Sequence, residues 1–269
     1  MKDIYENKEL YDLVRSFYKE YYSKTLKLSD WESRFNTYRI NEEEKLGKKV
    51  VTFFEQQQIS LNNKKILIVG GGSGAEFFYI NQTYSESLVY TVDPCMKAVE
   101  IMNFKADLLG IPLDNIKVAY SEKLPFESNF FDIVICYTVL EHVKDVEKSL
   151  LEMYRVAKIK GKIMIETPNY LFPEEQHYKV MIFPPKISKR LARLNLKVIG
   201  KYTDFFESLN FFSAHDIDKI MNKNNMPFER IDLQIKYVNF KTFIRYFPKY
   251  LFGWMFKISR NQLIFITKS

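Results

Sequence analysis

The chain has 269 residues, of which 46% are hydrophobic and 27% are charged, and its net charge is +7. This length suits one large α/β domain with additions or two small domains, and the globular composition excludes an intrinsically disordered protein. The N-terminus is polar, which predicts no signal peptide, and no apolar run approaches the roughly 18 residues of a membrane-spanning helix. The chain has only two cysteines, which predicts a cytoplasmic protein without a disulfide framework.

Residues 1–58 have a helical pattern and are expected to form an N-terminal extension that caps the rest of the chain. From residue 65 onward, nearly all-apolar segments alternate with helical ones. The predicted strands are 65–69, 88–93, 116–121, 131–139 and 160–169, and the predicted helices are 95–110, closed by Gly110, and 144–158. This β-α-β-α order predicts a parallel sheet with helices on both faces.

The alternation stops after Asn169. Residues 170–210 contain three prolines and a basic stretch, so we expect a substrate-side insertion there. Ser213 and Asp216 have the spacing of a capping box at the start of another helix. Segments 228–240 and 261–268 complete an α/β, Rossmann-like domain at 59–269. Its seven-stranded sheet is expected to be mostly parallel, with an antiparallel last strand.

The first predicted strand ends in a glycine-rich loop that contains Gly70, Gly71, Gly72 and Gly74. Glycines at such a junction let backbone N–H groups and a helix N-terminus approach a ligand closely. Asp93 ends the second predicted strand, where a carboxylate can accept hydrogen bonds from ribose hydroxyls. The loop fits the G-x-G-x-x-G/A pattern of dinucleotide sites and the G-x-G-x-G pattern of S-adenosylmethionine sites. By itself it predicts a nucleoside cofactor without identifying it.

Two further segments decide between a dinucleotide and S-adenosylmethionine. They are 121–145 (SEKLPFESNFFDIVICYTVLEHVKD) and 160–169 (KGKIMIETPN). Together with the loop and Asp93, they resemble the class I S-adenosylmethionine-dependent methyltransferases. The similarity is to the small-molecule branch, with quinone-biosynthesis O-methyltransferases and enzymes of surface-polysaccharide clusters. It covers residues 60–170 and implies S-adenosylmethionine as the cofactor and methyl transfer as the reaction.

The resemblance also implies roles for individual residues of the cofactor site. The Gly70–Gly74 loop would hold the methionine part of the cofactor, and Asp93, next to Pro94, would hold the ribose. The residues expected to contact adenine are Met96, Ser121 and Glu122.

Two positions depart from the family pattern. Ile68 stands where the family often has an acidic residue that anchors the loop, and Tyr120 stands where it usually has an adenine-binding aspartate. A non-catalytic nucleoside-binding protein with the same fold therefore stays an alternative to an enzyme. A nicotinamide-dependent oxidoreductase is a third interpretation, which nothing after Asp93 supports.

Methyl transfer from a sulfonium is an in-line displacement that requires alignment and removal of the acceptor's proton, and no metal is expected. His142, in LEHV, and His177, in the segment after TPN, are the predicted catalytic residues. The alternative for His142 is a helix-capping or loop-orienting role, and for His177 an exposed position in a lid. Tyr137 is predicted to lie over the sulfonium, with core packing as the alternative.

The charge is uneven, with a net −4 over residues 1–178 and +11 over residues 179–269. The basic aromatic segment 237–260 suits contact with anionic lipid head groups or with a phosphorylated or lipid-linked glycan. An apolar helix packed on the sheet or on a second subunit, and RNA binding, are the alternatives. The fourth-strand sequence CYTVLEH lacks the [NDS]-P-P-[YFW] motif of base-methylating enzymes, so we expect no nucleic-acid substrate.

We therefore predict methyl transfer to a hydroxyl of a small or carrier-linked acceptor, such as a glycan sugar. A quinone or a lipid is the alternative acceptor. The expected location is the cytoplasm, with peripheral contact at the inner membrane face.

Overall fold

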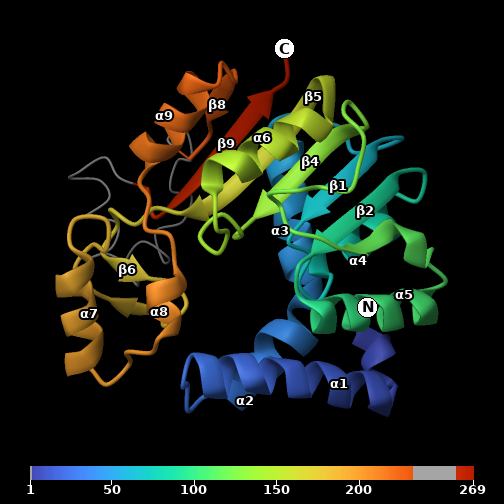
Figure 1. Cartoon of the computed structure of the whole chain (residues 1–269). Helices are drawn as coiled ribbons and strands as arrows, with labels where there is room; N and C mark the ends of the chain where they lie inside the picture. Colours follow the sequence, from blue (N-terminus) through green and yellow to red (C-terminus); the bar gives the residue numbers. More distant parts are fainter. Residues whose placement is uncertain (1, 233–258) are drawn as a thin grey trace.

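The computed structural model describes residues 2–232 and 259–269, and its centre is a seven-stranded sheet (Figure 1). The strand order is β3-β2-β1-β4-β5-β9-β8, and every neighbouring pair is parallel except the two pairs that contain β9. The predicted mostly parallel sheet with an antiparallel last strand is thus confirmed. The strands of this sheet are β1 (Lys65–Val69), β2 (Leu88–Asp93), β3 (Ile116–Val118), β4 (Phe131–Tyr137), β5 (Ala157–Pro168), β8 (Phe228–Arg230) and β9 (Asn261–Thr267).

One predicted strand is shorter in the structure than expected. The predicted strand 116–121 ends at Val118, because its partner β2 ends at Asp93 and the chain beyond has no strand left to pair with. The Ala119 N–H donates a final hydrogen bond to the Asp93 carbonyl at 3.2 Å. Most of the predicted strand 228–240, and residues 237–258 of the basic aromatic segment, lie outside the described residues.

Several helix ends follow local chemistry that the sequence predicts. Ser213 and Asp216 form the expected capping box, and Gly110 closes α5 in the left-handed conformation. The helices are α1 (Lys8–Lys19), α2 (Trp31–Phe35), α3 (Glu43–Gln56), α4 (Ala75–Thr83), α5 (Met96–Leu109), α6 (Val146–Val156), α7 (Lys189–Val198), α8 (Phe205–Ser208) and α9 (Ala214–Lys223). Shorter 3₁₀ or π-helical turns are η1 (Lys2–Glu6), η2 (Glu20–Thr25), η3 (Asn36–Asn41) and η4 (Leu113–Asn115).

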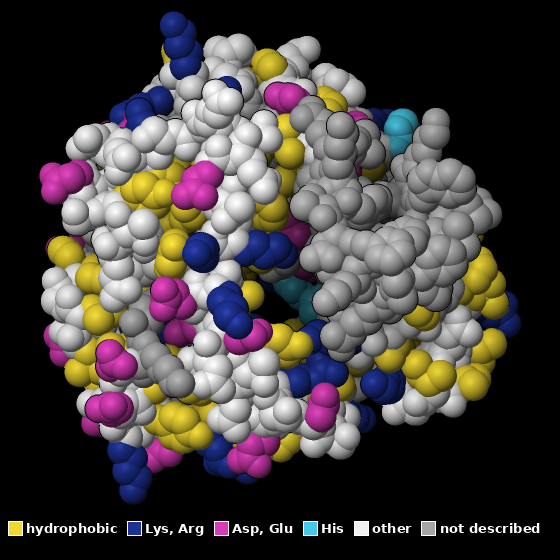
Figure 2. All heavy atoms as spheres, turned by 180° about the vertical axis from the view of Figure 1, so that it is seen from behind, with side chains coloured by type: hydrophobic (Ala, Val, Ile, Leu, Met, Phe, Trp, Pro, Cys, Tyr) yellow, Lys and Arg dark blue, Asp and Glu magenta, His cyan; other side chains and the backbone are white. Residues whose placement is uncertain are grey.

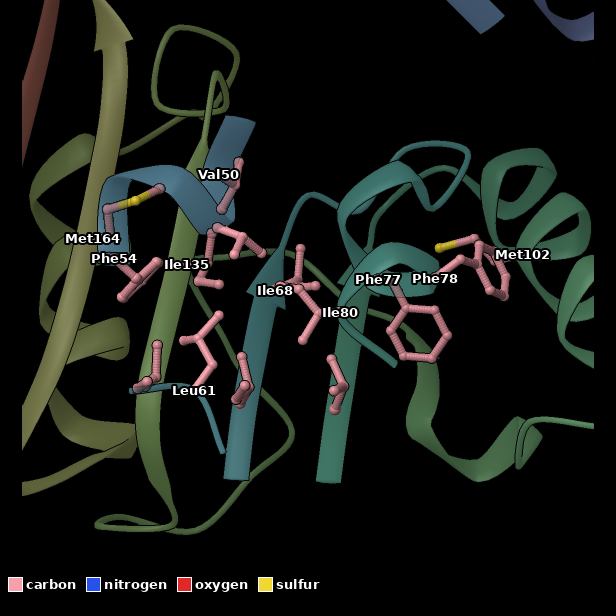
Figure 3. Close-up of a cluster of buried hydrophobic side chains, with 14 of the residues drawn as sticks. Val50, Phe54, Leu61, Ile68, Phe77, Phe78, Ile80, Met102, Ile135 and Met164 are labelled. Atoms are coloured by element: carbon pink, nitrogen blue, oxygen red, sulfur yellow. The ribbon is translucent and has the colours of Figure 1, made fainter. Parts of the chain in front are cut away.

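Alternate side chains of the central strands enter two separate cores. Ile68 and Ile135 point to the face covered by α3, α4 and α5, where Phe54 and Phe77 pack against them (Figure 3). Their neighbour Leu67 and similar residues pack on the other face against α6 and α9. Burial on both sides explains why these strands are almost wholly apolar, and the predicted helices on both faces are confirmed.

A third core lies away from the sheet, where the N-terminal helices meet the segment that follows β5. Leu10, Val14 and Phe35 of the N-terminal extension share one cluster with Tyr178 and Leu196. Tyr178 lies in the turn between the short strands β6 (Glu174–Glu175) and β7 (Val180–Met181), which form an antiparallel hairpin near α7 and α8 (Figure 1). Among the described residues, no helix combines the length and the apolar composition needed to span a membrane.

Candidate active site

The glycine loop connects β1 to α4 at the carboxyl end of the central strands. Gly70, Gly72 and Gly74 have φ values of +75°, +53° and +92°, which glycine adopts without steric cost. A Cβ on Gly70 would lie 2.4 Å from Val139 Cγ2, whereas a Cβ on Gly72 would meet nothing within 4 Å. The loop is therefore packed closely at Gly70 and borders open space at Gly72, where a ligand has room to bind.

The Asp93 carboxylate lies at the end of β2 and is fixed by the neighbouring backbone. Its Oδ2 accepts from the Gly72 N–H at 2.9 Å, and its Oδ1 accepts from the Cys95 N–H at 2.8 Å. Burial raises the pKa of Asp93, and the two backbone hydrogen bonds oppose this effect. Since each carboxylate oxygen keeps a further lone pair, Asp93 can still accept from two ribose hydroxyls.

The residues expected at the adenine have different environments in the structure. Met96 and Tyr120 are 75% and 57% exposed, so both offer apolar surface beyond the ends of β2 and β3. Ser121 is buried and hydrogen-bonded to the Ser149 hydroxyl at 2.8 Å. The Glu122 carboxylate accepts the backbone N–H of Lys144 at 2.8 Å. Ser121 and Glu122 thus hold the surrounding loops together, and their contact with adenine stays a prediction.

The loop anchor that is missing at Ile68 is supplied by a buried network from other elements. Glu43 of α3 and Lys105 of α5 form an ion pair with 2.6 Å between Oε1 and Nζ, and both side chains are at most 2% exposed. Lys105 Nζ also donates to the Ser73 carbonyl at 2.9 Å. The Ser73 hydroxyl donates to Glu43 at 3.2 Å and accepts from the Tyr18 hydroxyl at 2.8 Å. The N-terminal extension is therefore bonded directly to the glycine loop.

This network has a recognisable signal in the sequence. Lys105 occupies a helical position in line with the buried residues Ala98, Ile101 and Met102, where a charged side chain requires a buried partner. The acidic residues 42–44 fit the start of a helix equally well, so the sequence did not single out Glu43 as that partner. Burial lowers the pKa of Lys105, and the charge of Glu43 opposes this shift.

The two predicted catalytic histidines lie together in the structure. His177 is in the turn of the β6–β7 hairpin, and its Nε2 lies 3.4 Å from His142 Nε2. On the other side of the ring, His177 Nδ1 lies 2.7 Å from Oε1 of the fully buried Glu175. The second oxygen of Glu175 accepts the Tyr178 backbone N–H at 2.9 Å. A fixed carboxylate thus orients the His177 ring, and the sequence analysis did not identify Glu175.

The charges around the two rings move their pKa values in opposite directions. Burial disfavours the charged form of His177, but the charge and hydrogen bond of Glu175 outweigh it and raise the pKa of His177. Partial burial and the neighbouring His177 lower the pKa of His142, which favours its neutral form. His177 is the stronger base of the pair.

Glu141 is a third ionisable group beside the two histidines. Its side chain is 1% exposed, and it accepts a hydrogen bond from the Thr167 hydroxyl at 3.2 Å. Burial raises the pKa of Glu141 to about 7. The donor atoms of Glu141, His142 and His177 lie within 4.8 Å of one another, a set that could also bind a divalent cation, although none was expected from the sequence.

A cavity of about 220 Å³ lies between the N-terminal extension and the β6–β7 hairpin. It is lined by His177 and by three cations, Arg34, Arg39 and Lys179. Arg34 pairs with Asp30 at 2.9 Å, but among the described residues no carboxylate lies within 4.0 Å of Arg39 or Lys179. Figure 2 shows a hollow with histidine side chains in its depth and lysine or arginine side chains at its rim. This cavity favours an anionic or strongly polar ligand.

Tyr137 at the end of β4 has a partly buried ring, which packs against the core on the face of the sheet that α3, α4 and α5 cover. Its hydroxyl accepts a hydrogen bond from Lys49 Nζ at 2.7 Å. Core packing is therefore present in the structure, and contact with a sulfonium stays a prediction.

Comparisons with known proteins agree with this geometry. Residues 67–165 match a family model described as a methyltransferase domain. Over 156 residues the chain is 26% identical to a ubiquinone biosynthesis O-methyltransferase of Rhizobium etli, covering 51% of this chain and 62% of that protein. Over 113 residues it is 33% identical to a ubiquinone/menaquinone biosynthesis C-methyltransferase of Psychromonas ingrahamii, covering 40% and 43% of the two chains.

The fold has solved counterparts. The structure of a SAM-dependent methyltransferase from Aquifex aeolicus superposes with a TM-score of 0.52 at 16% identity, covering 83% of this chain and 89% of that chain. The chain spans 62% and 43% of the length of the two curated relatives. The matched segment contains the glycine loop and Asp93, whose open space and carboxylate fit a nucleoside cofactor. Residues 67–165 are thus similar to methyltransferase domains, the chain has the fold of the solved SAM-dependent methyltransferases, and this similarity supports S-adenosylmethionine as the cofactor.

Proposed function

We propose that this chain transfers a methyl group to a hydroxyl oxygen of a small or carrier-linked acceptor and that His177 accepts the hydroxyl proton. The main support is the Glu175–His177 pair, with 2.7 Å between Oε1 and Nδ1. When Nδ1–H donates to Glu175, Nε2 carries the lone pair that can accept a proton, on the side of the ring that faces His142. S-adenosylmethionine supplies an electrophilic methyl group when bound. The residues of this chain align the acceptor and remove its proton.

The roles of the other groups follow from their positions. A proton taken by Nε2 makes His177 positively charged, and the buried Glu175 carboxylate stabilises that charge. His142 stays neutral and lies beside the hydroxyl-facing nitrogen, so it adds no competing positive charge. Closure of the site by the N-terminal extension and the hairpin limits access of water.

The proposed acceptor is a sugar hydroxyl of a glycan that carries an anionic group. The support is the cavity with Arg39 and Lys179, which can bind a phosphate or carboxylate next to His177. The volume of about 220 Å³ suits one small ring or one end of a larger molecule. A quinone-like acceptor is the second candidate, since one similar protein is a ubiquinone biosynthesis O-methyltransferase. The proposed location is the cytoplasm, at the inner membrane face when the acceptor is carrier-linked.

Cofactor binding is tested by thermal unfolding with S-adenosylmethionine, S-adenosylhomocysteine and NAD. A ligand at about 100 times its dissociation constant adds about 2.7 kcal/mol to the free energy of unfolding. For a chain of this size, the expected rise in Tm is roughly 5–11 °C. We expect this rise with both adenosyl compounds, and its loss in Asp93→Ala. Asp107→Ala, an exposed change on α5, is the matched control, and a rise with NAD alone would contradict the proposal.

Turnover is tested by measuring S-adenosylhomocysteine formation with sugar phosphates, diphosphate-linked glycans, neutral sugars and hydroquinones. We expect the anionic sugar acceptors to give the fastest turnover, with one added O-methyl group identified by mass and NMR. Preference for hydroquinones would support the second candidate. A methyl group on carbon would contradict hydroxyl transfer. Binding of S-adenosylmethionine without turnover of any acceptor would favour a non-catalytic protein.

A further inference from the structure

Exposed apolar side chains are concentrated in one stretch, which we call the α7 surface (residues 181–201). Of the 15 large apolar side chains that are exposed among the described residues, seven lie in this stretch. The exposed fraction reaches 54% for Leu194, 63% for Ile187 and 78% for Val198. The full set is Met181, Phe183, Ile187, Leu191, Leu194, Val198 and Ile199. Single exposed apolar residues are common, but such a group indicates a contact surface.

The α7 helix has apolar residues on two faces. Ala192 and Leu196 are fully buried and anchor the helix in the third core. Leu191, Leu194 and Val198 follow at steps of three and four residues, so they share a second face. Packing within the described chain accounts for the first face and leaves the second in contact with solvent.

The same surface is strongly basic. Residues 181–201 contain six lysines and arginines and no aspartate or glutamate. Lys186 pairs with Asp216, and Lys189 and Arg193 pair with Glu207. In the described part of the chain, no carboxylate lies within 4.0 Å of the other three cations, which are Arg190, Lys197 and Lys201.

We propose that the α7 surface docks on a membrane that contains anionic lipids. Its apolar side chains enter the boundary between head groups and acyl chains, while Arg190 and Lys197 contact lipid phosphates. A second copy of the chain is a poorer occupant, because a two-fold interface would bring the same uncompensated cations together. Apolar side chains and cations without a carboxylate partner on one helix are complementary to an anionic lipid surface, although Lys197 Nζ also lies 5.0 Å from the centre of the Tyr202 ring.

Docking in this way would place the reaction centre close to the lipid. Strand β7 leads from the turn that contains His177 and Lys179 into the α7 surface. The β6–β7 hairpin and α7 also share the third core, so they are packed together. The docking itself does not depend on the proposed reaction.

The test is co-sedimentation of the full chain with phosphatidylcholine vesicles that contain or lack phosphatidylglycerol. We expect binding to the anionic vesicles, which salt weakens. Leu194→Glu with Val198→Glu should lower this binding at least tenfold, and each of Arg190→Gln and Lys197→Gln should lower it about fivefold. The matched control is Leu151→Glu with Ile159→Glu, which are exposed by 42% and 64% on α6 and β5.

The S-adenosylmethionine-induced rise in Tm reports the fold of each variant. If the double Glu variant does not fold, Leu194→Ser with Val198→Ser replaces it. Wild-type protein that binds neither kind of vesicle would overturn the proposal. Undiminished binding of the folded variant would also overturn it and would place the contact elsewhere. A dimer that the same substitutions dissociate, without vesicle binding, would identify an interface between copies instead.

Discussion

The His177→Gln variant is expected to lower kcat by about 10²–10⁴-fold while keeping the S-adenosylmethionine-induced rise in Tm. Glutamine can still form hydrogen bonds in this turn, but it cannot accept the acceptor's proton at neutral pH. The measurement is S-adenosylhomocysteine formation at saturating cofactor and acceptor. His215→Gln, at an exposed position on α9, is the matched control and should keep full activity. Full activity of His177→Gln would exclude this residue as the base.

The pH dependence separates a base from a residue that only shapes the pocket. In the proposed mechanism His177 must be neutral to act as a base, so the rate should rise as the pH increases through the pKa of His177. Glu175 raises that pKa, and Glu175→Gln should therefore move the acidic limb of the kcat/KM profile to lower pH. The same variant should lower the maximal rate, because the protonated ring loses the carboxylate charge that stabilises it. An unmoved acidic limb would assign the titration to another group.

A chelator provides the control for this interpretation. Treatment with EDTA should leave the activity unchanged if His177 takes the proton itself. Loss of activity that manganese or zinc restores would show that Glu141, His142 and His177 hold a cation, and the base assignment would then be wrong.

A second large effect is expected when the buried Lys105–Glu43 pair is broken. Lys105→Met leaves the Glu43 carboxylate buried without its cation, which typically costs about 3–5 kcal/mol. The corresponding fall in Tm is roughly 6–20 °C for a chain of this size. S-adenosylmethionine affinity should fall as well, because Lys105 also holds the Ser73 carbonyl in the glycine loop. Thermal unfolding and calorimetric titration measure the two effects.

Two further variants make this experiment specific. Glu43→Gln combined with Lys105→Met should recover part of the lost stability, since no unpaired charge then remains buried. Lys97, which is also on α5, forms an exposed ion pair with Glu20. Lys97→Met should therefore lower the free energy of unfolding much less than Lys105→Met. Equal losses from Lys97→Met and Lys105→Met would contradict a special role for the buried pair.

The fold could be predicted from the sequence for two reasons. The strands are apolar on both faces, which indicates a sheet covered by helices on both sides. The glycine loop marks a tight turn with positive φ values between the first strand and the next helix. The position of Asp93 beside the glycine loop could also be predicted, since the end of β2 is adjacent to this loop in any sheet of this type. The end of β3 could not, because the length of an edge strand depends on its partner. These are properties of neighbouring segments, which local patterns describe.

The contacts that organise the candidate active site depend on distant segments. His142 and His177 are 35 residues apart, and they meet because the turn of the β6–β7 hairpin lies beside the loop that follows β4. Glu43 and Lys105 are 62 residues apart, and only the fold, which brings the first residue of α3 to α5, reveals that they are partners. Glu175 lies two residues before His177 in the sequence EEQH. The two side chains meet because this segment enters the turn of a hairpin, which the sequence alone did not show.

The third core has a consequence for exchanging specificity between relatives. Val14 and Phe35 from the N-terminal extension pack in one cluster with Tyr178 and Leu196 from the other end of the cavity. Densely packed neighbours of this kind tolerate replacement only when their volumes stay matched. A graft of residues 170–210 from another enzyme would leave a mismatched core unless residues 1–58 came with it. The two segments that border the cavity must therefore be exchanged together, although more than a hundred residues separate them in the chain.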